Sequence, residues 1–251
     1  MANEKVNFLN ENGQVLAARL ELPEGDPKGF ALFAHCFTCN KNLTAARNIG
    51  RALTKAGIAV LRFDFTGLGE SEGAFEDTNF SSNVEDLVSA SNFLAENYQS
   101  PKILVGHSLG GAAVIFAAAR IESVRAVVTI GAPSDPKHVQ HLFKSDIQEI
   151  EEKGEARLSI GGTEFKIQKQ FLDDINQKNM ARTLENLRKA LLVMHSPQDT
   201  TVGIENAGEI YQAAWHPKSF ISLDGADHLL SEKKDSLYVG KLIAAWSERY
   251  I

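Results

Sequence analysis

Short apolar runs alternate with segments of helical periodicity along most of the chain. Strands separated by helices predict a mostly parallel sheet with helices on both faces, and the apolar runs fit strands buried on both sides. An antiparallel hairpin at residues 5–9 and 14–23, joined by Asn12 and Gly13, adds one edge and gives an eight-stranded α/β fold. The predicted strands are 5–9, 14–23, 29–35, 58–64, 102–106, 126–130, 190–194 and 219–223, and the predicted helices are 45–56, 83–97, 109–120 and 237–248.

One long polar stretch, residues 134–186, interrupts this alternation. It contains helical pieces at 138–152 and 169–177 and a predicted hairpin around Gly161 and Gly162. Because it follows the carboxyl end of a strand, where α/β proteins place their sites, we expect a lid over a site. The alternative is a surface elaboration without function. The sequence therefore predicts one domain, 1–251, that carries 134–186 as a lid or cap.

Composition and charge limit the classes of partner and the cellular location that we expect for this protein. The net charge is -6 and no long basic run occurs, which argues against nucleic acid and anionic membranes as partners. The first residues lack the apolar core of a secretory signal, and no apolar run reaches the roughly 20 residues of a membrane helix. Two cysteines in 251 residues do not make a disulfide framework. A cytoplasmic protein is expected.

The pentapeptide Gly106-His107-Ser108-Leu109-Gly110 matches G-x-S-x-G. An apolar strand runs directly into it and an Ala-rich helix runs directly out, which is the context of a nucleophile elbow. The sharp turn forces the serine backbone into a strained conformation and holds its hydroxyl clear of the chain at a helix N-terminus. A phosphate-binding turn is the alternative, but no Lys follows as in a P-loop, and the turn lies too late for a dinucleotide fingerprint.

A serine hydroxyl needs a base, and in this fold the order along the chain is Ser, acid, His. His228 follows the last predicted strand and so lies at the carboxyl end of the parallel strands, as Ser108 does. His216 precedes that strand and lies at the opposite end of the sheet. His195 ends a strand at the correct edge but precedes the acid, so we expect it to line or support the site. The remaining histidines fall in a predicted oxyanion loop, in the elbow and in the lid: His35, His107, His138 and His141.

The acid should lie just after the strand that precedes the base. Asp199 occupies that loop, which follows the strand 190–194. Asp224 and Asp227 are rivals, but residues so close in sequence to His228 rarely fold back to orient its imidazole. The predicted catalytic residues are therefore Ser108, Asp199 and His228.

Tetrahedral intermediates need backbone N–H donors. We expect one from Leu109, directly after the nucleophile, and one from Phe37, in the loop after the strand 29–35, with Cys36 as the second choice. His35, Cys36 and His107 are expected to contact substrate. No cofactor or metal is required.

Cys36 and Cys39 form a C-x-x-C between a strand and a helix. We favour two small buried thiols that shape the loop. A thioredoxin-like redox pair is an alternative, because a helix N-terminus lowers a thiol pKa. A metal site that includes His35 is a third, although a closed structural site needs four ligands.

These motifs resemble those of α/β-hydrolases over essentially the whole chain, a resemblance that implies a Ser108–Asp199–His228 triad with Leu109 and Phe37 as oxyanion donors. Residues 64–71, Asp-Phe-Thr-Gly-Leu-Gly-Glu-Ser, match the family's glycine-rich turn, which is usually structural. The family commonly has His-Gly where this chain has His35 and Cys36. More narrowly, residues 35–39, 63–71 and 129–134 are similar to the hydrolase half of bacterial hydrolase–OsmC fusion proteins.

The predicted function is a serine hydrolase that forms an acyl-enzyme, with a carboxylesterase acting on small or medium acyl groups as the leading candidate. A thioesterase or an amidase needs the same residues. Two alternatives belong to other classes: a non-catalytic binding or sensor module on the same scaffold, and a dithiol redox enzyme that uses Cys36 and Cys39.

Overall fold

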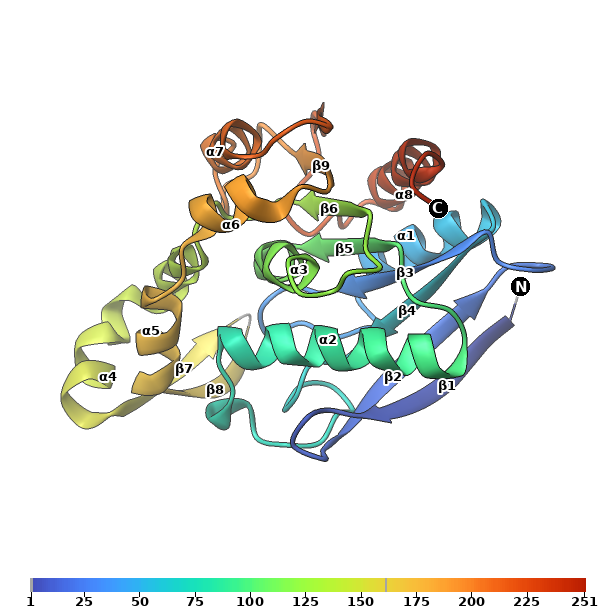
Figure 1. Ribbon diagram of the computed structural model, residues 1–251. Helices are drawn as coiled ribbons and strands as arrows, with labels where there is room; N and C mark the ends of the chain where they lie inside the picture. The colour runs from blue at the N-terminus through green and yellow to red at the C-terminus, as the bar shows by residue number, and fades with distance from the viewer. Residues whose placement is uncertain (1, 161) are drawn as a thin grey trace.

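The computed structural model describes residues 2–160 and 162–251 and contains the eight-stranded sheet (Figure 1). The hairpin β1–β2 lies at one edge, β2 pairs antiparallel with β4, and the remaining neighbours are parallel. The predicted α/β fold class is therefore confirmed. In spatial order the strands are β1 (Ala2–Leu9), β2 (Val15–Leu22), β4 (Ile58–Phe63), β3 (Gly29–Ala34), β5 (Ile103–His107), β6 (Ala126–Ile130), β9 (Ala190–His195) and β10 (Lys218–Ser222).

Alternate residues of the central strands supply two separate apolar cores, one on each face of the sheet. Leu32 and Leu104 pack in the core that includes α2 (Phe80–Asn97) and α3 (Leu109–Ala118). Phe33 and Val105, one residue further along each strand, pack in the core that includes α1 (Thr44–Lys55) and α8 (Lys233–Ser247). Because both faces are covered, these strands read in the sequence as continuous apolar runs.

Two helices begin earlier than predicted, and for one of them a capping residue sets the boundary. Helix α2 begins at Phe80 rather than 83, since the side chain of Asn79 accepts from the N–H of Ser82 in a capping box. Helix α8 begins at Lys233 rather than 237. The 3₁₀ turn η1 (Phe75–Asp77) and the helix α7 (Glu205–Ala213), between β9 and β10, were not predicted.

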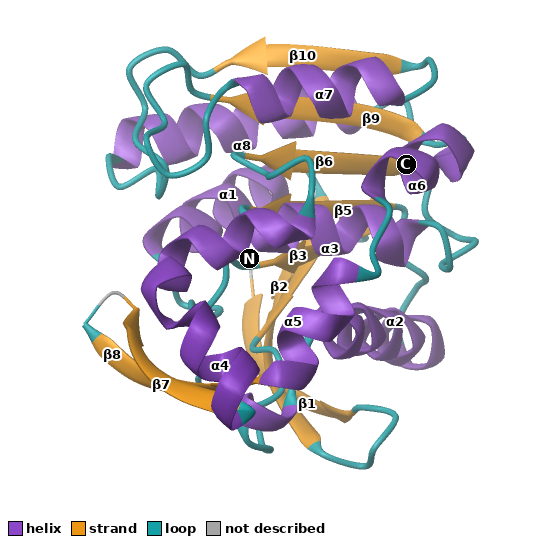
Figure 2. Cartoon of the chain, turned by 90° about the vertical axis from the view of Figure 1, so that its left-hand side faces the viewer, coloured by secondary structure: helices purple, strands orange, loops and turns teal. Residues whose placement is uncertain are grey.

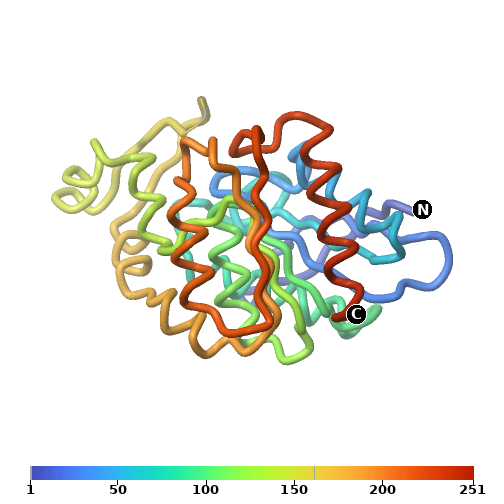
Figure 3. Tube along the Cα trace, turned by 90° about the horizontal axis from the view of Figure 1, so that it is seen from above, coloured from blue at the N-terminus to red at the C-terminus, as the bar shows by residue number. Residues whose placement is uncertain are grey.

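The segment between β6 and β9 lies on the side of the molecule toward which β5 and β6 point, and both termini lie on the opposite side (Figures 1 and 3). Its predicted hairpin and helices are present, although residues 136–146 are 3₁₀ rather than α-helical; Gly161 lies outside the described residues. Figure 2 shows the small sheet β7–β8 beside α4 and α5. The elements are η2 (Pro136–Asp146), α4 (Ile147–Lys153), β7 (Glu155–Ile160), β8 (Thr163–Gln168), α5 (Lys169–Asn176) and α6 (Met180–Leu187), the last of which was not predicted.

Candidate active site

Ser108 occupies the turn between β5 and α3 with φ 55° and ψ -127°, a conformation that L-residues rarely adopt. The two flanking glycines allow this turn because their backbones pass too close to others for a side chain. A Cβ on Gly106 would lie 2.2 Å from the carbonyl oxygen of Gly110, and one on Gly110 would lie 2.3 Å from that of His35. The motif therefore reflects close backbone contacts that hold the hydroxyl of Ser108 at the end of the sheet.

The three predicted catalytic side chains form one continuous hydrogen-bonded chain. The Nε2 atom of His228 lies 3.1 Å from Ser108 Oγ, and its Nδ1 atom lies 2.6 Å from Asp199 Oδ2. A carboxylate only accepts, so the imidazole carries its proton on Nδ1 and leaves Nε2 free to accept from the serine hydroxyl. This is the arrangement that a base needs in order to take the serine proton.

Asp199 is held in its ionised form by the loop that carries it. Its Oδ1 atom accepts from the backbone N–H groups of Thr201 and Val202, each at 2.9 Å, while Oδ2 accepts from His228. Burial raises the pKa of Asp199, but the hydrogen bonds from His228 and from these amides outweigh it, and the pKa lies below its ordinary value. The carboxylate is thus available to stabilise an imidazolium at neutral pH.

The rival acids face other partners. Asp227 accepts from the N–H of Ser231 at 2.8 Å, and Asp224 accepts from the side chain of Gln198 at 3.0 Å. Neither contact orients His228.

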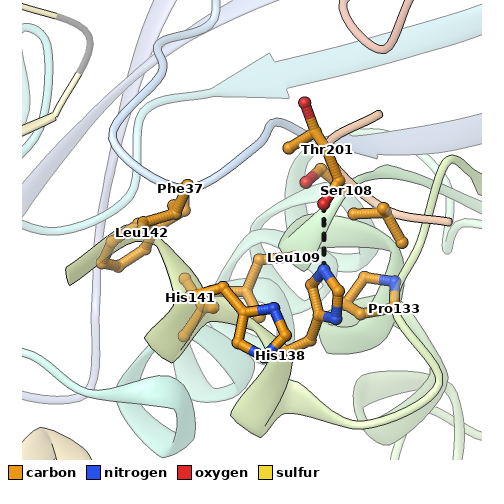
Figure 4. Close-up of a pocket in the computed structure, with 10 residues that line it drawn as sticks. Phe37, Ser108, Leu109, Pro133, His138, His141, Leu142 and Thr201 are labelled. Carbon is orange, nitrogen blue, oxygen red and sulfur yellow. Dashed lines mark hydrogen bonds between the residues drawn. The ribbon is translucent and has the colours of Figure 1, made fainter. Parts of the chain in front are cut away.

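A small cavity, of about 40 Å³, opens beside Ser108 (Figure 4). Phe37 and Leu109, the two expected oxyanion donors, both line it. Within residues 2–160 and 162–251, no protein acceptor is bonded to the N–H of Phe37 or Leu109, so both donors are available. The full lining is Phe37, Ser108, Leu109, Pro133, His138, Val139, His141, Leu142, Thr201 and Val202.

The three residues that we expected to contact substrate do not line this cavity, and their contact with substrate stays a prediction. His35 and Cys36 line a second, smaller cavity, which shares Phe37 and Leu109 with the first. His107 is buried and donates from Nε2 to the carbonyl oxygen of His228 at 2.7 Å. Burial lowers the pKa of His107 to about 4, so its ring is neutral at ordinary pH.

Each of the other two buried histidines bonds to the carbonyl of a residue in a loop of the site. His195 contacts the carbonyl of Val202 at 2.8 Å in the Asp199 loop, and His35 contacts that of Cys36 at 2.8 Å in the oxyanion loop. Burial lowers the pKa of both rings. The supporting position expected for His195 matches this contact.

Three residues beside the site were given no role in it from the sequence, although His138 and His141 were placed in the lid. Gly131, after β6, has φ +54°, and a Cβ there would lie 3.2 Å from Asp199 Oδ2 and 3.4 Å from His228 Nδ1. His138 and His141 line the cavity, and His138 Nε2 donates to the carbonyl of Thr201 at 3.0 Å, drawn as the dashed line in Figure 4. Their spacing of three places both on one face of the helix, as it would in a 3₁₀ or an α-helix.

The favoured interpretation of Cys36 and Cys39 as two separate thiols is wrong in this structure. The turn between them brings their Cα atoms to 5.3 Å, within the range that a disulfide spans, and the two are bonded. The metal alternative finds no support: the described part of the chain contains no group of three or more His, Cys, Asp or Glu residues that could hold an ion.

The glycine-rich turn at residues 64–71 anchors the oxyanion loop. Asp64 accepts from the backbone N–H of Lys41 at 2.6 Å and pairs with its ammonium at 2.5 Å, both groups being buried. A Cβ on Gly69 would lie 2.2 Å from that carboxylate, so the glycine makes room for it. The structural role implied by the resemblance agrees with these contacts.

Comparisons with known proteins agree with the fold and with the class of site. The family model "Serine aminopeptidase, S33" matches residues 25–145. The crystal structure of the esterase domain of a Rhodothermus marinus protein is 49% identical, with a TM-score of 0.82, over 100% of this chain and 99% of that one.

Two curated relatives point to acyl hydrolysis. The mitochondrial palmitoyl-protein thioesterase ABHD10 of Mus musculus is 28% identical over 92% of this chain and 78% of its own length. The monoglyceride lipase of Rattus norvegicus is 31% identical over 45% of this chain and 37% of its own length. The narrower resemblance to hydrolase–OsmC fusion proteins stays a prediction. Among the described helices, none is long and apolar enough to cross a membrane.

Proposed function

This chain belongs to the α/β-hydrolases, a family of esterase and thioesterase type, and from that membership we propose that it is a carboxylesterase in which Ser108 is acylated. The observation that carries the proposal is the unbroken hydrogen-bonded chain from Ser108 through His228 to Asp199. A buried carboxylate, an imidazole and an accessible hydroxyl in this order are the components of nucleophilic acyl transfer.

In the proposed reaction, Ser108 Oγ attacks the carbonyl carbon of an ester while His228 Nε2 takes its proton. The carboxylate of Asp199 stabilises the resulting imidazolium, and the N–H groups of Phe37 and Leu109 donate to the oxyanion. The proton then passes from His228 to the leaving alcohol. A water molecule, deprotonated by His228, then attacks the acyl-enzyme. As the bond to Ser108 Oγ breaks, His228 returns the proton to this oxygen, and the acid and free Ser108 are released.

The cavity supports an apolar acyl group of small or medium size. Phe37, Leu109, Val139 and Leu142 give it apolar walls, and the volume that they enclose is small, about 40 Å³. Thioester hydrolysis is the second candidate, because the Mus musculus relative is named as a palmitoyl-protein thioesterase. An amidase needs the same groups, so leaving-group preference distinguishes the three.

We further propose that residues 1–251 act as one hydrolase domain in which 134–186 is the lid. Four residues of this segment, His138, Val139, His141 and Leu142, line the cavity beside Ser108. The bond from His138 to Thr201 ties the segment to the acid loop. The cytoplasmic location stays a prediction, since the Mus musculus relative is described as mitochondrial.

The test compares wild type with Ser108→Ala on p-nitrophenyl esters and matched thioesters of increasing acyl length. We expect turnover by the wild type, highest on short and medium chains, and loss of at least about 1,000-fold in the variant. Equal rates in the two proteins would refute the mechanism. Failure of the folded wild type to react with a fluorophosphonate probe would favour the binding or sensor alternative instead.

A further inference from the structure

The segment between Cys36 and Cys39 is the least supported part of the oxyanion loop. On its N-terminal side, His35 is buried and contacts the N–H of Phe65 at 3.4 Å. On its C-terminal side, Lys41 is buried and paired with Asp64. Between these anchors the described backbone contributes one turn hydrogen bond, from the N–H of Cys39 to the carbonyl of Cys36 at 3.1 Å. Two local side-chain bonds add to it, from His35 to the carbonyl of Cys36 at 2.8 Å and from the Thr38 hydroxyl to the carbonyl of Phe37 at 2.7 Å. The disulfide therefore closes the part of the loop that the anchors do not hold.

The enclosed turn contains a strained residue. Thr38 has φ 60°, the left-handed region, which is a genuine outlier for a β-branched side chain. Such a conformation costs on the order of 1–3 kcal/mol and persists only where the surroundings enforce it. Because the Cys36–Cys39 bond spans Thr38, breaking that bond removes the constraint that opposes relaxation of this turn.

The same turn carries Phe37, whose N–H is an oxyanion donor in the proposed function. The Phe37 ring packs against Phe75 and Phe171 at centroid distances of 5.5 Å, which holds the side chain but leaves the backbone orientation to the turn. Relaxation at Thr38 would rotate the adjoining peptide groups. The position of the Phe37 N–H therefore depends on the state of the two sulfur atoms.

The two sulfur atoms differ in access. Cys36 is buried, at 4% exposure, whereas Cys39 is half-buried and precedes the exposed Asn40. Thiol–disulfide exchange requires a thiolate to approach one sulfur along the S–S axis, so access decides which sulfur is attacked. Cys39 is the accessible one.

We propose that the Cys36–Cys39 disulfide is a site of thiol–disulfide exchange with a dithiol reductant, and that its reduction lowers acyl-transfer activity by releasing the Phe37 N–H from the oxyanion position. This proposal rests on the proposed function for its effect on turnover, but not for the exchange itself.

A thiolate of the reductant attacks Cys39 Sγ and forms a mixed disulfide, while the Cys36–Cys39 bond breaks and Cys36 Sγ leaves with the electron pair and takes up a proton. The second thiolate of the reductant attacks its own sulfur in the mixed disulfide, and Cys39 leaves and is protonated. The protein gains two electrons and two protons, and the reductant becomes its own disulfide.

The first measurement is independent of activity. Folded wild-type protein is treated with dithiothreitol, free thiols are capped with a maleimide, and the mass is measured. Because the chain has 2 cysteines, any label belongs to this pair. We expect two labels after reduction and none before it. Absence of label in the reduced, folded protein would overturn the proposal.

The second measurement is turnover. Reduced protein, freed of dithiothreitol without oxygen, is assayed on a p-nitrophenyl ester beside the oxidised protein. We expect kcat to fall at least about tenfold on reduction, with KM changed less, because one oxyanion donor is worth roughly 100- to 1,000-fold. Reoxidation should restore kcat. Equal kcat in both states would overturn the control of activity, whereas an oxidised protein that hydrolyses no ester would refute the proposed function and leave the exchange measurable by mass.

Two variants distinguish an effect of the disulfide on the loop from a general loss of folding or activity. A Cys36→Ala, Cys39→Ala double variant should have the kcat of the reduced wild type, and this kcat should not change with dithiothreitol. Thr38→Asn, which tolerates the left-handed region, should show a smaller ratio of oxidised to reduced kcat than the wild type. An unchanged ratio in Thr38→Asn would overturn the role given to Thr38, and reduction of wild type remains the test if the double variant does not fold.

Discussion

The Nε2 atom of His107 donates to the backbone carbonyl of His228 across 2.7 Å, so the residue before the candidate nucleophile holds the loop of the candidate base. The two rings lie 5.1 Å apart between centroids. His107 Nδ1 has no hydrogen-bond partner among the described residues, and a proton there would be buried without an acceptor. The neutral ring therefore links the elbow to His228.

We predict that His107→Gln keeps this link and that His107→Leu breaks it. A glutamine amide can donate to the His228 carbonyl, so kcat should fall less than about tenfold. Leucine leaves the half-buried carbonyl of His228 without this donor, which costs about 1 kcal/mol of unfolding free energy and should lower kcat further. Chemical denaturation and ester hydrolysis measure the two effects. Equal kcat in the two variants would contradict the link.

The lowered pKa of His107 also predicts that the free energy of unfolding depends on pH. Its pKa is about 4 in the folded chain and 6.5 as the ordinary value. The unfolded chain binds this proton first as the pH falls, so the stabilisation is complete above pH 6.5 and is lost between pH 6.5 and 4, amounting to about 3 kcal/mol. The free energy of unfolding of His107→Gln should therefore fall less than that of the wild type between pH 7 and 4. Parallel curves would show that His107 does not contribute.

Gly131→Ala should impair the contact between Asp199 and His228. A Cβ would lie 3.2 Å from Asp199 Oδ2 and would also be strained at φ +54°. Gly154→Ala is the matched control, because its φ is +84° and nothing lies within 4 Å of its Cβ. Both variants should lose about 1 kcal/mol of stability through the backbone, but kcat should fall about tenfold or more in Gly131→Ala alone. A comparable fall in the control would remove the explanation through crowding.

Asp199→Asn should lower kcat by roughly 10⁴-fold, because an amide cannot hold the His228 tautomer that accepts the serine proton. Asp224→Asn and Asp227→Asn are the comparisons, since their carboxylates contact Gln198 and Ser231 instead. These two variants should stay within about threefold of wild type. A loss in Asp227→Asn as large as in Asp199→Asn would mean that the acid is wrongly assigned.

Phe37→Ala should shift the preference toward longer acyl chains while it keeps the backbone N–H. Phe37 lines both the cavity beside Ser108 and the smaller neighbouring cavity, so removal of the ring should join them. Phe116→Ala, whose ring packs on Phe80 instead, controls for lost aromatic packing. The measurement is kcat/KM over a series of p-nitrophenyl esters. The same optimum in Phe37→Ala and wild type would show that the ring does not separate the cavities.

The sequence by itself determined the sheet and the elbow. Apolar runs of strand length are recognisable because both faces of each central strand are buried, and G-x-S-x-G is recognisable because Gly106 and Gly110 make contacts that no side chain permits. The order of Ser108, Asp199 and His228 also follows from strand order, since parallel strands end at one edge. The burial of both strand faces and the close contacts of the two glycines are local features, so they leave patterns that can be recognised in the sequence.

Only the tertiary structure decided what surrounds those three residues. Gly131 and His138 come from segments whose own patterns point to a turn and to a helix, and their nearness to Asp199 and Thr201 depends on how β6, β9 and η2 pack. The disulfide was not predicted, because C-x-x-C is compatible with separate thiols, which we favoured, with a redox pair and with a metal site until the turn at Thr38 sets the distance between Cys36 and Cys39. Contacts between distant segments depend on packing geometry, which residue spacing does not encode.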